Sequence, residues 1–124
     1  MIKIPRVILL IETSTGYGRQ LIHGVSRYSR IHGPWNFYCE CGSKEKPLPN
    51  LEKWGADGII ARDSVRVEFI YPKRIPTIIT NTSEPAPRYP HVVCDNETTG
   101  IMAAEHLLEK GFKRFAYCGF NDTY

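Results

Sequence analysis

The chain lacks long hydrophobic runs. Its N-terminal apolar run, Val7 to Ile11, falls far short of the roughly 18 or more apolar residues that a membrane-spanning helix needs. The same run is too short for the core of a signal peptide, and no small-residue cleavage site follows it. We therefore expect a cytoplasmic protein that does not enter a membrane.

Clusters of like charge are also missing. The 16 lysines and arginines and 13 acidic residues give a net charge of +3 and are spread along the chain. A nucleic-acid-binding surface normally requires a basic patch or a basic helix. The composition therefore argues against direct DNA contact by this chain.

Cysteines are few, and their spacing matches no metal site. The chain has 4, and it lacks the two matched CxxC-like pairs of a zinc site. A bridge between Cys39 and Cys41 would be strained, because the two residues lie on one face of an expected strand. We expect all four, including Cys94 and Cys118, to be small buried apolar residues, and we expect no metal and no cofactor.

What the chain does have is a regular alternation of strand and helix patterns. Its 124 residues, 42% of them hydrophobic, suffice for one domain with a core. Alternation of this kind predicts an α/β fold with a doubly wound parallel sheet. Strands are expected at residues 6–11, 35–41, 57–61, 77–80, 92–94 and 114–117, and helices at residues 17–32, 50–54, 64–71 and 96–110.

The last third of the chain carries the clearest boundary signals. Asp95 or Asn96 can cap the start of a helix, and Gly111 can adopt the left-handed conformation that ends one. The continuous apolar run at 92–94 predicts a strand buried on both faces. The final strand runs almost to Tyr124, so we expect the chain to be a piece of a longer protein.

These elements and motifs together resemble the amino-terminal lobe of the periplasmic-binding-protein-like fold, as found in sensor domains of the lac and galactose repressor family. The resemblance implies a ligand cleft between this lobe and a second lobe that is absent here. The matching motifs are Asp95-Asn96, Gly100, Ala103 or Ala104, His106-Leu107, Gly111, residues 114–117, residues 56–60 and residues 75–78.

Within that family, residues 17–25 and 115–117 are most similar to regulators of xylose operons. Such regulators begin with the sensor and carry an AraC-type DNA-binding domain at the carboxyl end. The resemblance implies that residues 1–124 are the amino-terminal subdomain of a sugar sensor with D-xylose as effector. It also implies a homodimer that contacts DNA only through a domain absent from this chain.

Ligands of doubly wound sheets bind beyond the carboxyl ends of the strands. Glu12 and Thr13 follow the first strand, and the Glu12 carboxylate can accept hydrogen bonds from sugar hydroxyls. Tyr17 can lie against the apolar face of a sugar ring. Arg19, one turn into the helix, can reach the ligand or a carboxylate.

Further candidates follow the later strands. Arg62 and Asp63 come after the third strand and could either face the cleft or pair with each other. Asn81 follows the fourth strand, where the resemblance implies an Asp or Asn that contacts sugar. Asp95 is a candidate ligand group whose alternative role is the helix cap.

Three other functions compete with the sensor. A solute-binding protein of a sugar transporter uses the same lobe. A dinucleotide-binding enzyme would need a third glycine where Leu21 stands after Gly16 and Gly18, and its glycines would sit at the turn. A phosphoacceptor receiver domain would need clustered acids after the first strand, where Glu12 stands alone. We therefore expect no enzyme activity.

Overall fold

The computed structural model describes residues 3–39, 54–62, 74–80 and 89–119. The chain divides into two units, Met1–Val92 and Val93–Tyr124, and each is described by itself. Among the described residues, no helix is long and apolar enough to cross a membrane.

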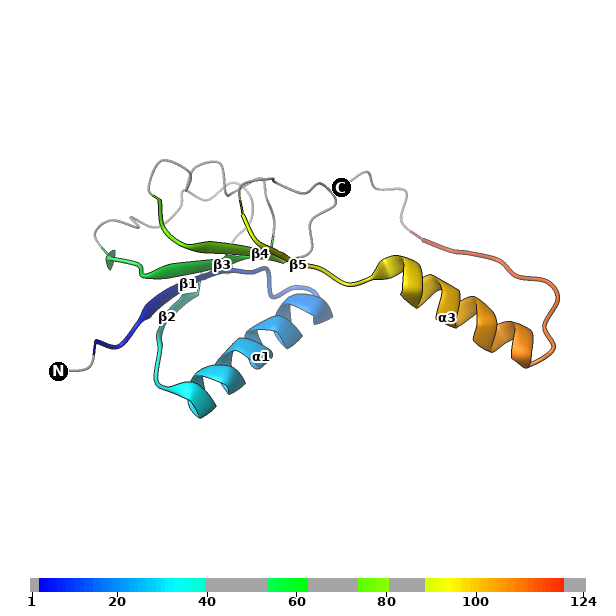
Figure 1. Ribbon diagram of the computed structural model, residues 1–124, viewed down its shortest axis with the longest axis horizontal. Coiled ribbons are helices and arrows are strands. Elements are labelled where there is room, and N and C mark those ends of the chain that lie inside the picture. The colour runs from blue at the N-terminus through cyan, green and yellow to red at the C-terminus, as the bar shows by residue number, and fades with distance from the viewer. Residues whose placement is uncertain (1–2, 40–53, 63–73, 81–88, 120–124) are drawn as a thin grey trace. The chain divides into compact units, whose positions relative to one another are not determined.

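The first unit is built on a five-stranded parallel sheet (Figure 1). Its strands stand in the order β2-β1-β3-β4-β5, so the chain leaves β1 toward one edge and then returns past β1 to β3. This order confirms the predicted doubly wound parallel fold. The strands are β1 (Arg6–Leu10), β2 (Asn36–Cys39), β3 (Gly58–Ala61), β4 (Thr77–Thr80) and β5 (His91–Val92).

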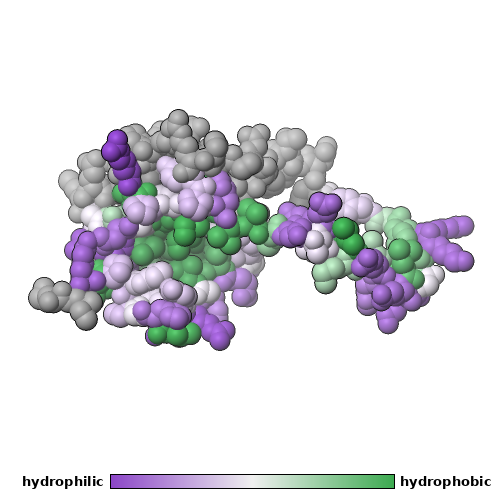
Figure 2. All heavy atoms as spheres, viewed as in Figure 1, coloured by the Kyte–Doolittle hydropathy of each residue, from purple (hydrophilic) through white to green (hydrophobic). Residues whose placement is uncertain are grey.

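Strand β1 is buried on both faces and holds the two halves of the core together. Because side chains alternate along a strand, its residues divide between two apolar clusters. One contains Ile8, Leu10, Ile59, Ala61 and Ile79, and the other contains Val7, Leu9 and Ile11. In Figure 2 hydrophobic side chains gather over the sheet strands of this unit.

Helix α1 (Gly16–His32) covers the second of these clusters. Leu21, Ile22 and Val25 pack against it, which places α1 along one face of the sheet (Figure 1). The helix begins one residue before the predicted start and ends at the predicted residue. Gly33, at φ +129, follows its last residue, in a conformation that L side chains rarely adopt.

Asp57 ties the beginning of β1 to the segment that leads into β3. Its carboxylate accepts a hydrogen bond from the Arg6 backbone N–H at 2.9 Å and forms an ion pair with Lys3. The hydrogen bond from Lys3 and then the one from Arg6 lower the pKa of Asp57 below its ordinary value. The ionised form is therefore the one that the fold favours.

The edges of the sheet differ from the prediction. Strand β5 has only two residues and one neighbour, and Val92 is 61% exposed. The expectation of a strand at 92–94 buried on both faces was wrong, because an edge strand has few neighbours to cover it. The expectation of buried cysteines was wrong for the three that are described: Cys39 lies on the exposed edge strand β2, and Cys94 and Cys118 are exposed outside regular elements. Cys41 lies outside the described residues.

The second unit contains helix α3 (Asn96–Glu109), capped as predicted. The Asp95 carboxylate accepts from the Thr98 backbone N–H at 2.9 Å and from the Thr98 hydroxyl at 2.7 Å. These bonds, the backbone one first, lower the pKa of Asp95. Gly111 has a φ of +84 just after the helix, as expected.

The strand predicted at 114–117 is absent: residues 112–119 form neither helix nor strand. A strand needs a hydrogen-bonded neighbour, and the described part of the second unit contains no strand. The helices predicted at 50–54 and 64–71 fall outside the described residues, except for Trp54, and so do residues 40–41 of the second predicted strand.

The two adjacent isoleucines of β4 offer a matched test of the core. Ile79 is fully buried and Ile78 is 40% exposed. We expect Ile79→Ala to lower the free energy of unfolding by about 2–5 kcal/mol. Ile78→Ala should cost well under half of that in the same urea titration. Equal losses would contradict the burial of Ile79 in the core between β1, β3 and β4.

The Asp57 contacts predict a pH dependence. Since the folded pKa lies below the ordinary value of 3.8, the ionised carboxylate contributes stability above pH 3.8, which is lost as pH falls through the folded pKa. Urea denaturation at a series of acid pH values should show a smaller decline in stability for Asp57→Asn than for the wild type. Glu105→Gln, which removes an exposed carboxylate of α3, serves as the control and should leave the decline nearly unchanged.

Candidate ligand site at the carboxyl ends of β1 and β3

The register of the sheet brings the ends of β1 and β3 to the same level. Leu10 is aligned with Ala61, the last residue of each strand. The Arg62 backbone N–H donates to the Leu10 carbonyl at 3.1 Å and continues the ladder by one step. Because the strand order reverses between β1 and β3, this is the topological switch point, where open α/β sheets bind ligands.

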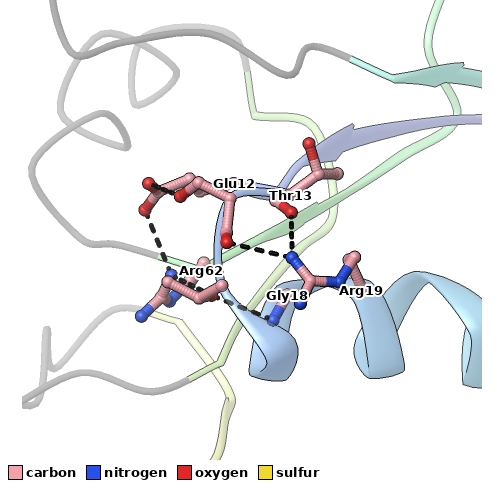
Figure 3. Close-up of polar contacts among 7 residues, drawn as sticks. Glu12, Thr13, Gly18, Arg19 and Arg62 are labelled. Atoms are coloured by element: carbon pink, nitrogen blue, oxygen red, sulfur yellow. Dashed lines mark hydrogen bonds and ion pairs between the residues drawn. The ribbon is translucent and has the colours of Figure 1, made fainter.

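An ion pair joins the two strand ends at this point. Arg62 Nη1 lies 3.2 Å from Glu12 Oε2, and the Ser14 hydroxyl donates to Glu12 Oε1. Figure 3 shows Glu12 and Arg62 pointing toward one another. The Arg62 side chain is 23% exposed and that of Glu12 is 57% exposed. An ion pair with this much solvent exposure contributes at most about 1 kcal/mol to stability. Its main effect is to position the two side chains.

Two further contacts hold the Arg62 guanidinium. Its Nη1 also donates to the Thr15 hydroxyl at 3.1 Å, and its Cζ lies 5.5 Å from the centre of the Tyr17 ring. A cation over an aromatic face at this distance is attracted by roughly 0.5–1 kcal/mol at an exposed site. Arg62 is thus positioned by the loop after β1 and by the start of α1.

Arg19 contacts the loop after β1. Its Nη1 donates to the carbonyls of Thr13, at 2.8 Å, and Ser14, at 2.9 Å. Arg19 therefore ties the loop after β1 to the first turn of α1 (Figure 3). Thr13 enters this arrangement through its backbone carbonyl.

Thr15 and Gly18 set the approach of α1 to the strand end. The Thr15 hydroxyl caps the helix by accepting from the Gly18 backbone N–H at 3.3 Å. A Cβ on Gly18 would lie 1.7 Å from the Glu12 carbonyl oxygen, so only glycine allows this contact. The first turn of α1 consequently lies directly against the backbone that carries Glu12.

Of the predicted site residues, the structure brings five together: Glu12, Thr13, Tyr17, Arg19 and Arg62. Asp63 and Asn81 lie outside the described residues. Asp95 belongs to the second unit, where both of its carboxylate oxygens bind Thr98.

Three participants were missed by the sequence reasoning: Ser14, Thr15 and Gly18. Thr15 had a readable signal, because threonine just before an apolar helical pattern is a common helix cap. The role of Gly18 had none, since a close backbone approach depends on the tertiary arrangement.

Comparison with known proteins identifies the family of the chain. A family model described as the XylR N-terminal domain matches residues 6–97. The chain belongs to this family. The match contains the whole cluster around Glu12 and Arg62, together with strands β1 to β5.

Two curated relatives are xylose operon regulatory proteins. The one from Haemophilus influenzae is 30% identical over 92% of this chain and 31% of its own length. The one from Escherichia coli strain K12 is 27% identical over 98% of this chain and 32% of its own length. The chain therefore spans about a third of these relatives. No solved structure matches it significantly.

A pair of glycines in α1 tests the contact between the helix and the strand end. Gly18→Ala should displace the start of α1 and lower stability by about 2 kcal/mol or more, as overpacked sites do. Gly24 has open space around it, so Gly24→Ala should instead stabilise the helix by up to about 1 kcal/mol. Thermal and urea denaturation would measure both. A Gly18→Ala variant as stable as the wild type would contradict the close approach.

Proposed function

We propose that residues 1–124 form the amino-terminal subdomain of the effector-sensing domain of a DNA-binding transcription regulator of sugar catabolism. The effector is a sugar, with D-xylose as the first candidate, and it binds in a cleft between this lobe and a second lobe. The chain senses and does not catalyse. It acts in the cytoplasm as a homodimer, and an AraC-type domain elsewhere in the protein contacts DNA.

The observation that carries the proposal is the polar cluster at the switch point. A family of sugar-operon regulators and a doubly wound sheet both direct attention to the carboxyl ends of the strands. There the structure places a carboxylate, a guanidinium and an aromatic ring within one cluster. Hydrogen-bonding groups beside an aromatic face suit the hydroxyls and the apolar face of a sugar ring.

The relatives support the sugar class. The two described above are named for the xylose operon, which makes D-xylose the first compound to test. The spread of basic residues along the chain supports DNA contact through another part of the protein.

Titration calorimetry on the complete protein tests the proposal. We expect the complete protein to bind D-xylose or another neutral five-carbon compound from a panel of the pentoses L-arabinose and D-ribose and the pentitol xylitol. The isolated segment 1–124 should bind the same sugar at least about tenfold more weakly, because loss of even one hydrogen bond to a charged group costs about 1.5–3 kcal/mol.

Circular dichroism of the isolated segment is the control, since it reports whether the helices and strands have formed. Failure of the complete protein to bind any of these sugars would contradict the proposed function. Binding of equal strength by the folded segment and by the complete protein would contradict the two-lobed cleft.

A further inference from the structure

The two charged groups of the cluster do not stand in equivalent positions. Both carboxylate oxygens of Glu12 already accept hydrogen bonds, one from Ser14 and one from Arg62. These two contacts fix the direction of the carboxylate. Each oxygen keeps a second acceptor position, so a sugar hydroxyl that donated to Glu12 would share an oxygen that Ser14 or Arg62 already uses.

In the contacts that the structure describes, Arg62 keeps N–H donors that Glu12 and Thr15 do not use. A guanidinium carries five N–H donors, and the contacts that the structure describes for Arg62 to Glu12 and Thr15 both use Nη1. Its side chain is 23% exposed, against 57% for Glu12, so part of it is accessible to solvent. The contacts through Nη1 and the Tyr17 ring fix the direction in which the planar fork points.

The charges of the pair also bear on the ligand. Glu12 and Arg62 carry opposite charges at 3.2 Å, so the pair is neutral as a unit. A ligand with a carboxylate or phosphate would have to approach Glu12, and juxtaposed like charges disfavour a wrong partner. Hydroxyl oxygens accept from a guanidinium without this repulsion.

We propose that Arg62 is the residue of this cluster that contacts the sugar, that Glu12 acts through Arg62 as a positioning residue, and that the ligand is a neutral polyhydroxy compound. The inference rests on the proposed function and assigns the roles within its site. It differs from the simplest interpretation of the sequence, in which the Glu12 carboxylate itself receives the hydroxyls.

A double-mutant cycle in the complete protein tests these roles by titration calorimetry with D-xylose and D-xylonate. The variants are Arg62→Met, Glu12→Gln and the double variant, with Arg62→Lys to preserve the charge and Arg27→Met as a matched control on the exposed part of α1. Thermal denaturation without ligand shows whether each variant folds.

We expect Arg62→Met to weaken D-xylose binding by about tenfold to a hundredfold, and Arg62→Lys to retain part of it. Arg27→Met should bind as the wild type does. Glu12→Gln should weaken binding when Arg62 is present and have no effect in the Arg62→Met background, because residues that act through one another are not additive. Wild-type protein should bind D-xylonate more weakly than D-xylose. Glu12→Gln should reduce the ratio of the two affinities, because it removes the negative charge that repels the carboxylate of D-xylonate.

Three outcomes would overturn the inference. Additive effects of Glu12→Gln and Arg62→Met would show that Glu12 contacts the sugar by itself. A folded Arg62→Met variant that binds D-xylose as tightly as Arg27→Met does would show that Arg62 does not contact the sugar. The same conclusion would follow if folded Arg62→Lys lost no affinity relative to Arg27→Met. Tighter binding of D-xylonate than of D-xylose would reject the neutral ligand. If the wild type binds no neutral sugar from the panel, the proposed function fails first, and the inference falls with it.

Discussion

The burial of β1 on both faces is the constraint on which the rest of the first unit depends. One face of β1 packs with residues of β3 and β4, and the other is covered by α1. Parallel pairing with β2 and β3 occupies both edges of β1, so this strand lies in the interior of the sheet, where both faces can be covered. Because β1 cannot slip by one residue without exchanging its two faces, its register also sets the level at which Glu12 and Arg62 leave the sheet.

The register of β1 and two residues of the loop and helix that follow it determine the geometry of the polar cluster. The Arg62 side chain reaches Glu12 because β1 and β3 end level with each other. Helix α1 can begin beside the same point only because Gly18 has no side chain in contact with the Glu12 carbonyl. Thr15 then serves two purposes, since its hydroxyl both caps the helix and accepts from Arg62. The cluster is thus a consequence of how one strand and one helix meet.

Much of this fold was predictable, and the failures have a physical pattern. The central strands and α1 were found because burial on two faces and an apolar helical stripe leave clear periodic signals. The errors lie at the periphery. Val92 continues an apolar run but stands on a two-residue edge strand, and the segment at 114–117 lies in a unit whose described residues contain no strand. Hydrophobicity alone cannot tell a strand from a segment without a neighbour, because pairing is a property of two segments.

In the candidate site, too, the positions of the residues were predictable from the sequence, but their pairing was not. That Glu12 and Arg62 lie at the same edge of the sheet followed from their places after two parallel strands. Whether Arg62 would pair with Asp63 or with a distant carboxylate could not be read locally, and the structure joins it to Glu12, 50 residues away. That pairing changes the chemistry expected of each residue. A carboxylate bound to an arginine has a fixed direction, and an arginine held through one nitrogen keeps its other N–H donors in a fixed plane. Residue type and strand position place both groups at the carboxyl ends of the strands, but the register of the sheet decides which charges pair with each other.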